Sequence, residues 1–511
     1  MSGRGRRLAA LESHVAALER PGPERRRGPT PYPGTILDAM ADAGMVGASW
    51  SSWRTFWRGV FALPFEEPGE LALFQERTGR TRPPTAPVRE VFQIIGRRGG
   101  KTRNAALCAL WLGCRENYHA SLAPGERALI VAIGADRGQA GQVLGYLKGF
   151  CASSAFHPFV RRTLTESIEL TTGATVEVRS ASFRTTRGFT LAGIIADELG
   201  FWRVEDGSAN PDSEIFQALK PGLATISGSL FCALSTPYRR QGELFKAWER
   251  HYGKDEADTL IWVAPSLVMN PTLSPDVVQR AYQDDEIAAR SEFGAEWRAD
   301  LEPYISLEAL QAVTVPGRLE LAPFTPGPAR DADPRRPVLP PSYVGFVDMS
   351  GGSSDSSALA VAHHEPRTGR AVLDLVREAR APHAPDRIAS EFVVELQRYD
   401  VRQVYGDRYG AEWVAQAFRT RGMDYRSSER SKSDLYRELL PICNSGDAEM
   451  LDLPRLRAQL LGLERRVARG GRDSIDHGPG GHDDLANAVA GALVFAADRA
   501  SELPGGFWFN W

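Results

Sequence analysis

The sequence predicts an α/β protein with two large domains. Its 511 residues exceed the usual size of one domain. Between residue 91 and about residue 240, short apolar runs alternate with helical patterns, which is typical of a parallel sheet covered by helices. A second group of strand-like runs follows a proline-rich stretch at 315–341. We therefore expect one α/β domain on each side of that stretch.

The composition is that of a globular protein, with 42% hydrophobic residues. Five cysteines are scattered and none forms a CxxC pair, which argues against a disulfide framework or a zinc module and favours a reducing compartment. No apolar run approaches the roughly 20 residues that span a bilayer, so we expect no membrane segment. The net charge of −3 does not point to nucleic acid, but local Lys and Arg stripes can be hidden in a total.

Composition also predicts the boundaries. We expect a flexible basic tail over 1–34, a first domain with a helical lead-in over 35–300, a proline-rich linker over 301–341, a second domain over 342–500 and a C-terminal tail over 501–511. The arginines of the first tail fit a solvated, disordered segment, and a docking arm for DNA or a partner stays open as the alternative.

The elements of each domain follow from hydrophobic periodicity. Aromatic residues at helical spacing predict a lead-in helix around Trp53 and Trp57 that packs on the first domain. The first domain then has predicted strands at 128–133, 175–179, 194–196 and 230–234, and helices at 103–112 and 139–150. The second has predicted strands at 343–347, 358–363 and 371–376, and helices at 386–399, 412–421 and 484 to about 499.

A glycine-rich loop, Gly96–Thr102, follows the apolar run Val91–Ile95. Glycines such as Gly96, Gly99 and Gly100 let backbone N–H groups converge on a polyphosphate, and the helix that follows directs its positive N-terminal end at the same group. Lys101 would neutralise phosphate oxygens and Thr102 would bind Mg²⁺. The fit to GxxxxGK[ST] is imperfect, because Ile95 takes the place of the first glycine; a structural turn is the alternative.

A second apolar run, Leu191–Ala196, ends in Asp197 and Glu198. Asp197 would hold the Mg²⁺ through water, and Glu198 would orient or deprotonate an attacking water. An ordinary acidic pair that caps the next segment is the alternative.

Charge that develops on a transferred phosphoryl group needs an arginine. Arg97 lies in the loop, while Arg184 and Arg187 precede the acidic run and could act on a neighbouring subunit; a surface arginine is the alternative for each. The run Leu234–Pro237 ends the next strand with a Ser/Thr pair that could sense the γ-phosphate, or it could be a plain turn.

Four aspartates in the second half predict a metal centre. Asp348 and Asp407 each end a strand, and Asp483 and Asp484 open the last helix. Carboxylates that converge in this way repel one another unless a hard cation such as Mg²⁺ or Mn²⁺ lies between them, and two such ions would assist phosphodiester cleavage. Individually each acid could be a turn or helix-cap residue.

In this order, the motifs Gly96–Thr102, Ile194–Glu198, Leu234–Pro237, Asp348, Asp407 and His482–Ala488 resemble those of the large terminase subunit of tailed double-stranded DNA bacteriophages. The resemblance implies an additional-strand (ASCE-type) P-loop ATPase domain with a parallel-rich central sheet and then an RNase H-like nuclease domain. It matches Arg97 to a family arginine four residues before the lysine, Arg187 to an arginine that acts across a ring, and Asp484, rather than Asp483, to the third catalytic acid. Asn487 stands where relatives often have a further Asp, and Gln75 is a candidate for adenine contact.

The resemblance also implies ATP with Mg²⁺ at the first site, two Mg²⁺ or Mn²⁺ ions at the second, and cleavage of concatemeric DNA with ATP-driven packaging. The implied partners are double-stranded DNA, the portal of a procapsid, a small terminase subunit and copies of the chain in a ring, usually a pentamer, with a monomer in solution left open. The implied location is the host bacterial cytoplasm and, transiently, the portal vertex. A helicase or translocase with a nuclease domain, used in repair or phage defence, is the alternative function.

Overall fold

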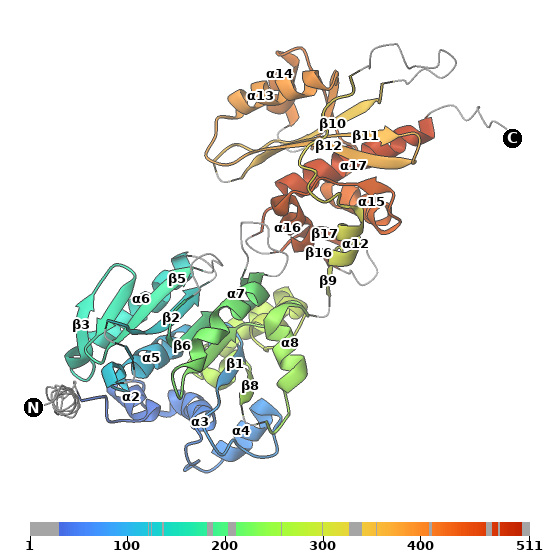
Figure 1. Cartoon of the computed structure of the whole chain (residues 1–511). Helices are drawn as coiled ribbons and strands as arrows, with labels where there is room; N and C mark the ends of the chain where they lie inside the picture. Colours follow the sequence, from blue (N-terminus) through green and yellow to red (C-terminus); the bar gives the residue numbers. More distant parts are fainter. Residues whose placement is uncertain are drawn as a thin grey trace, which may run out of the picture. The chain divides into compact units, whose positions relative to one another are not determined.

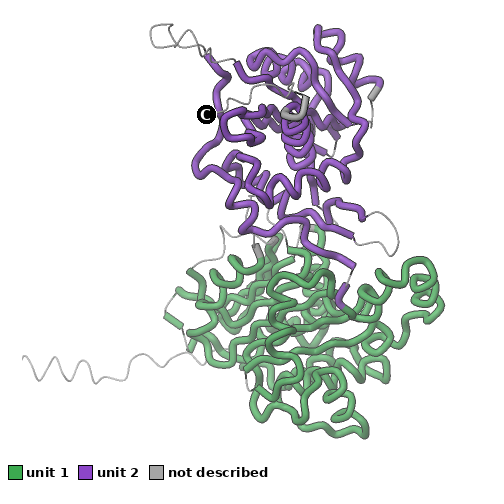
Figure 2. The backbone as a smooth tube through the Cα atoms, turned by 90° about the vertical axis from the view of Figure 1, so that its right-hand side faces the viewer, with its two compact units in different colours: residues 1–202, 212–296 green, residues 203–211, 297–511 purple. Residues whose placement is uncertain are grey.

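The computed structural model describes residues 30–120, 122–123, 125–134, 137–180, 188–202, 211–256, 258–298, 300–325, 340–353, 355–407, 411–466, 473–478 and 481–502. The chain forms two compact units, one from residues 1–202 and 212–296 and the other from 203–211 and 297–511 (Figure 2). The helical pattern of the N-terminal tail, Arg184 and Arg187 lie outside the described residues. Within the described part of the chain, no helix combines the length and hydrophobicity needed to cross a bilayer.

An eight-stranded sheet forms the centre of the first unit (Figure 1). Its order is β3-β4-β5-β2-β6-β7-β1-β8, and all neighbours from β5 to β8 are parallel, whereas the β3–β4–β5 edge is antiparallel. The strands are β1 (Glu90–Ile95), β2 (Ala128–Gly134), β3 (Val160–Thr163), β4 (Ser167–Leu170), β5 (Ala174–Ser180), β6 (Leu191–Asp197), β7 (Leu230–Ser235) and β8 (Thr259–Ala264). Strand β7 lies between the loop-bearing β1 and the acid-bearing β6, which is the additional-strand arrangement expected from the sequence.

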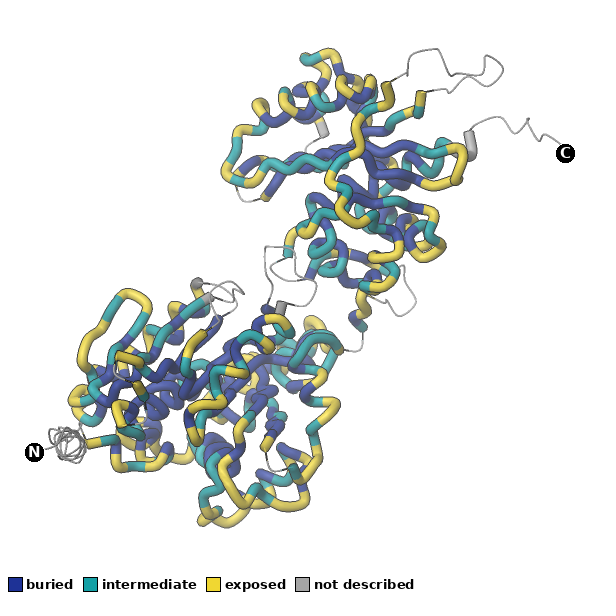
Figure 3. Tube along the Cα trace, viewed as in Figure 1, coloured by how far each residue is buried: buried dark blue, intermediate teal, exposed yellow. Residues whose placement is uncertain are grey.

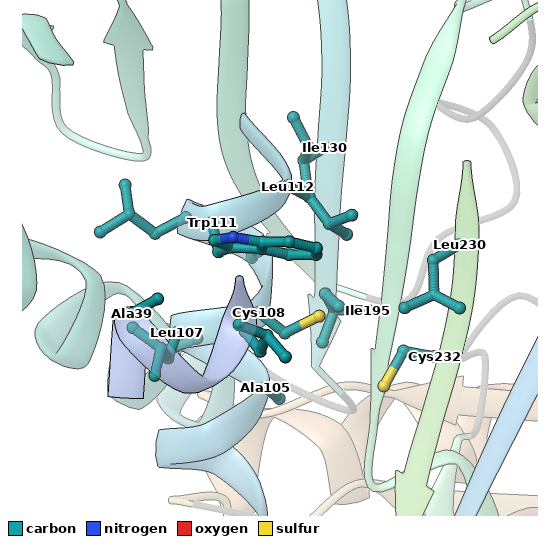
Figure 4. Close-up of a cluster of buried hydrophobic side chains, with 14 of the residues drawn as sticks. Ala39, Ala105, Leu107, Cys108, Trp111, Leu112, Ile130, Ile195, Leu230 and Cys232 are labelled. Carbon is teal, nitrogen blue, oxygen red and sulfur yellow. The ribbon is translucent and has the colours of Figure 1, made fainter. Parts of the chain in front are cut away.

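Helices cover both faces of this sheet. They are α2 (Ile36–Asp42), α3 (Ser51–Val60), α4 (Glu70–Thr78), α5 (Lys101–Cys114), α6 (Arg137–Cys151), α7 (Pro211–Leu219), α8 (Gly242–His251), α9 (Ser266–Met269), α10 (Pro275–Asp284) and α11 (Glu286–Glu292). Helix α5 is almost entirely buried: Cys108 and Leu112 lie among side chains of β2, β6 and β7 (Figure 4). On the other face, the Phe216 ring of α7 packs against Phe92 and Phe231.

The predicted lead-in helix is α3. Trp53, Phe56 and Trp57 are fully buried in the same core as α5, so the aromatic spacing predicts the packed face correctly. The predicted strands and helices of both domains are found within a few residues of their expected bounds.

The second unit has a six-stranded sheet in the order β14-β13-β10-β11-β12-β15. Neighbours β10, β11 and β12 are antiparallel, and β13 and β14 join the β10 edge in parallel. Three antiparallel strands followed by two parallel ones on the first strand's free edge form the expected RNase H-like sheet. The strands are β10 (Tyr343–Asp348), β11 (Ser357–Glu365), β12 (Arg370–Ala379), β13 (Gln403–Gly406), β14 (Asp424–Ser427) and β15 (Ala448–Glu449).

Alternate side chains of this sheet enter two separate cores. On one face, Phe346 and Ala360 pack under helices α12 (Leu307–Val313), α15 (Lys432–Asn444), α16 (Pro454–Gly462) and α17 (Asp484–Glu502). On the other, Val347 and Leu359 pack under α13 (Pro385–Arg398) and α14 (Ala411–Arg419). Burial along the tube follows this pattern, with the central strands buried and the outer helix faces exposed (Figure 3).

The linker expected over 301–341 needs a correction. Strand β9 (Leu301–Pro303) pairs with β16 (Leu463–Arg466), which also pairs with β17 (Ser474–His477), and Leu310 and Val313 of α12 are buried in the second core. These apolar residues precede the first proline of the cluster, Pro316, and pack as ordinary core side chains. Residues 301–314 therefore belong to the second unit, and of the proline-rich part only 315–325 and 340–341 are described.

Gly491 offers a test of this packing. An added Cβ there would lie 2.2–2.5 Å from ring atoms of Phe346, far inside contact distance. Gly491→Ala should improve helix propensity by about 1 kcal/mol but cost about 1–3 kcal/mol in overpacking, so it should lower the thermal unfolding temperature. Gly462→Ala, which has open space around its Cβ position, is the matched control. An unchanged unfolding temperature for Gly491→Ala would contradict the packing of α17 on β10.

Candidate nucleotide and metal sites

The loop Gly96–Thr102 connects β1 to α5, at the carboxyl end of the parallel strands. Gly100 has φ 89°, a left-handed conformation that favours glycine, and immediately precedes α5. Gly96 is glycine for a different reason: an added Cβ would lie 2.3 Å from Ser266 Oγ and 2.6 Å from the Phe293 carbonyl. The glycine that is one place late in the motif thus permits close approach of the chain around Ser266.

Lys101 lies buried inside the loop. Its Nζ donates to the carbonyls of Ile95 (2.8 Å) and Gly96 (3.3 Å) and to Thr236 Oγ1 (3.0 Å), and it lies 3.9 Å from Glu198 Oε1. Burial lowers the pKa of Lys101, and the charges of Glu198 and Asp197 oppose that effect. The ammonium is held at the place where the sequence predicts phosphate oxygens.

Asp197 and Glu198 lie at the end of β6, next to this lysine. Burial, and then the charge of Glu198, raises the pKa of Asp197 to about 7, while Lys101 and a hydrogen bond from Thr102 oppose the shift. Glu198 has a left-handed backbone (φ 51°), so its side chain leaves the strand direction and stays partly exposed. The structure therefore brings together Lys101, Thr102, Asp197 and Glu198, as the sequence predicts.

The end of β7 connects the acid to the lysine. Ser235 Oγ (3.2 Å) and the backbone N–H of Thr236 (3.3 Å) donate to Glu198 Oε2, and Thr236 Oγ1 accepts from Lys101. The Ser/Thr pair is therefore more than a plain turn: it contacts both charged groups of the site.

Other predicted residues of the first site are placed differently. Arg97 is 61% exposed and pairs with Glu292 at 3.3 Å, so its phosphate contact stays a prediction. Gln75 Nε2 donates to the carbonyl of Thr81, and within the described part of the chain no hydrogen bond joins it to the loop. The role of Arg187 stays a prediction, because that residue is outside the described range.

In the second unit, Asn487 connects two of the predicted acids. Its Nδ2 donates to Asp348 Oδ2 at 2.8 Å and to Asp407 Oδ2 at 2.6 Å. The parallel pairing of β10 with β13 brings the ends of these strands together, and α17 places the amide between them. Burial, followed by the charge of Asp407, raises the pKa of Asp348 well above its usual value, and burial also raises the pKa of Asp407.

The two adjacent aspartates of α17 have different surroundings. Burial, and then the charge of Asp483, raises the pKa of Asp484 to about 6, and Asp484 in turn contributes to the raised pKa of Asp348. Asp483 is neutralised instead: Tyr436 donates to its Oδ2 at 2.9 Å and Lys432 Nζ lies 3.0 Å from the same oxygen. Asp484 is therefore the acid with charge to offer a cation, whereas Asp483 is held by its own partners.

Both sites fit a divalent cation. Asp197 Oδ1, Asp484 Oδ2 and Asn487 Oδ1 are buried atoms without a hydrogen-bond partner. Such oxygens are costly unless a donor or a cation satisfies them, and oxygen donors suit Mg²⁺ and Mn²⁺. A further group, Asp476, His477 and Asp483, has ligand atoms within 4.8 Å of one another, but Lys432 already bonds two of its members.

Several residues of these sites are not predicted by the sequence motifs. Trp53 Nε1 donates to the Gly99 carbonyl and Ser266 Oγ to the Arg97 carbonyl, while Lys432 and Tyr436 hold Asp483. The aromatic spacing of α3 indicates burial but not an indole N–H directed at the loop. Asn487 is singled out by the sequence only as a doubtful ligand, and its bridging bonds follow from the sheet topology.

Comparisons with known proteins gave matches among solved structures alone. No protein-family model matches the chain, and no curated protein does. The chain is similar to the HK97 bacteriophage large terminase (15% identity, 80% of this chain and 91% of the other, TM-score 0.33). It is similar to the large terminase of a thermophilic bacteriophage in complex with ADP (13%, 88% and 98%, 0.36), and to the magnesium-bound large terminase nuclease of the thermophilic phage G20c (18%, 36% and 94%, 0.27). Similarity at this level does not by itself assign a function.

Asp348→Asn tests the electrostatics of the second site. Because the folded-state pKa of Asp348 lies above its ordinary value of 3.8, the carboxylate destabilises the cation-free fold at neutral pH and not below pH 3.8. The substitution should raise the unfolding temperature at pH 8 by about 2–4 °C for each kcal/mol of relieved charge, and the gain should shrink toward pH 5. Thermal unfolding in a chelator measures it, with the exposed Asp400→Asn as control. A lower unfolding temperature at pH 8 would contradict this electrostatic account.

Proposed function

We propose that the chain is a terminase large subunit, which uses ATP to move double-stranded viral DNA into a procapsid and cuts concatemeric DNA with divalent metal ions. The observation that carries the proposal is the pairing of two sites in one chain. Lys101, Asp197 and Glu198 surround a phosphate-type loop on an additional-strand sheet, and Asp348, Asp407 and Asp484 gather on an RNase H-like sheet.

At the first site, Thr102 and Asp197 would hold Mg²⁺, which supplies charge neutralisation for the β- and γ-phosphates of ATP. Lys101 would exchange its three internal acceptors for phosphate oxygens. Glu198, oriented by the donors at Ser235 and Thr236, would orient the attacking water and accept its proton. When Lys101 binds phosphate it leaves Thr236, so the end of β7 would respond to the occupancy of the site.

At the second site, Asp348, Asp407 and Asp484 would hold Mg²⁺ or Mn²⁺, and two ions would stabilise the attacking and leaving oxygens of a phosphodiester. Asn487 keeps Asp348 and Asp407 facing one another in the cation-free protein. Lys432 and Tyr436 neutralise Asp483, which limits the repulsion that its neighbour Asp484 experiences.

The remaining parts of the proposal rest on the motif order. They are an arginine from Arg97 or from Arg187 of a neighbouring copy, adenine contact by Gln75, a ring on the procapsid portal, a small terminase subunit, and activity in the host cytoplasm. A helicase of repair or defence is the second candidate, but β8 is followed by α9, α10 and α11 in the same unit, and the described residues contain one phosphate-type loop.

Separate substitutions should divide the two activities. Glu198→Gln removes the proton acceptor and should slow ATP hydrolysis by about 10²–10⁴-fold while leaving Mn²⁺-dependent cutting of plasmid DNA intact. Asp348→Ala should abolish cutting while leaving ATP hydrolysis within about twofold, since the residues lie in different units. The measurements are phosphate release and gel-based cleavage on both variants, with the exposed Glu286→Gln as a control for each assay. Loss of both activities in either variant, or of neither, would refute the two-site assignment.

A further inference from the structure

The carbonyl groups of the phosphate-type loop are bonded in an ordered way. Four successive carbonyls each accept from a different side chain: Arg97 O from Ser266 Oγ (2.6 Å), Arg98 O from Asn270 Nδ2 (2.8 Å), Gly99 O from Trp53 Nε1 (3.0 Å) and Gly100 O from Asn104 Nδ2 (3.2 Å). The carbonyls just before them, Ile95 O and Gly96 O, accept from Lys101 instead. The loop thus has one carbonyl set on the lysine and another on surrounding side chains.

This division has a consequence for the N–H groups. In a trans peptide the C=O of one residue and the N–H of the next point in opposite directions. When a side chain outside the loop holds the carbonyls of residues 97–100, the N–H groups of residues 98–101 are fixed on the opposite side. Helix α5 begins directly after Gly100, which has no side chain to cap it, so its first N–H groups are available to a ligand as well.

We propose that Trp53, Ser266 and Asn270 are positioning residues that pre-orient the loop's N–H groups for a nucleotide's phosphates. The proposal rests on the nucleotide site of the proposed function and goes beyond it, because none of the three belongs to a phosphate-binding motif. They come from α3, from the start of α9 and from the residue after α9, two segments distant from the loop in sequence. Trp53 and Ser266 are fully buried, so water cannot replace their bonds without rearrangement.

The same contacts explain why a loop with Ile95 at the first glycine position can still function. Ser266 approaches Gly96 so closely that a Cβ would collide with it, and Ile95 Cγ2 would lie 2.6 Å from a Cβ on Gly99. The curvature that a first glycine permits in the ordinary motif is here imposed from outside, by the α3 and α9 segments. Pre-orientation of donors raises affinity because the cost of ordering them is met during folding.

The test compares matched single substitutions in the full chain. Trp53→Phe removes the indole N–H from the loop, and Trp111→Phe removes an indole N–H that donates over the same 3.0 Å to a different glycine carbonyl, Gly34 O. Ser266→Ala removes a hydroxyl donor from the loop, and Ser229→Ala removes one that donates to Leu223 O at 2.7 Å. The Kd for ADP with Mg²⁺, from isothermal titration calorimetry, and the KM and kcat for ATP are measured beside the unfolding temperature.

We expect the Kd for ADP and the KM for ATP to rise about tenfold in each loop variant and less than about twofold in its control, the effect of one lost hydrogen bond. A merely structural role would lower the unfolding temperature of variant and control alike without separating their nucleotide affinities, and that result would overturn the inference. If the unaltered chain binds no ADP, the proposed nucleotide site is refuted and this inference with it. If Trp53→Phe does not fold, the comparison of Ser266→Ala with Ser229→Ala still decides.

Discussion

Carboxylates at the ends of buried strands are the constraint on which both sites depend. A strand that is apolar along its length places its last side chain at the rim of the core, where water only partly solvates a charge. Asp197 at the end of β6 and Asp348 at the end of β10 are in this position, and burial is the main reason for the raised pKa of both. The fold keeps these acids at a cost that only a cation or a donor can offset.

The two units offset that cost in different ways. In the first, a buried lysine from the neighbouring loop supplies a full positive charge close to Asp197 and Glu198, and the arrangement is nearly neutral before any ligand arrives. In the second, Asp348 and Asp407 receive only an amide from Asn487, which donates hydrogen bonds without charge. The second site therefore keeps excess negative charge, and its affinity for cations should be the larger of the two.

Much of this arrangement follows from the sequence, and the rest depends on contacts between distant segments. The strand before Lys101, the strand before Asp197 and the final helix from Asp484 are set by local periodicity, and the structure contains all three. The bonds from Trp53 and Ser266 to the loop are not predictable in this way, because they join residues 46 and 169 positions apart. The predicted start of the linker is wrong for a related reason: Leu310 and Val313 reveal their burial only when a distant helix packs on them.

Asn487 illustrates why an amide rather than a fourth acid suits this position. It lies three residues after Asp484 on α17, so both side chains are on the same face of the helix. A carboxylate at 487 would add a like charge beside two acids that already have raised pKa values, and it could not donate to either. The amide donates to both acids when no cation is present, and its partnerless Oδ1 is a neutral oxygen that can approach a cation without adding charge. A neutral residue at 487 thus makes a cluster of three close acids compatible with a folded, cation-free protein.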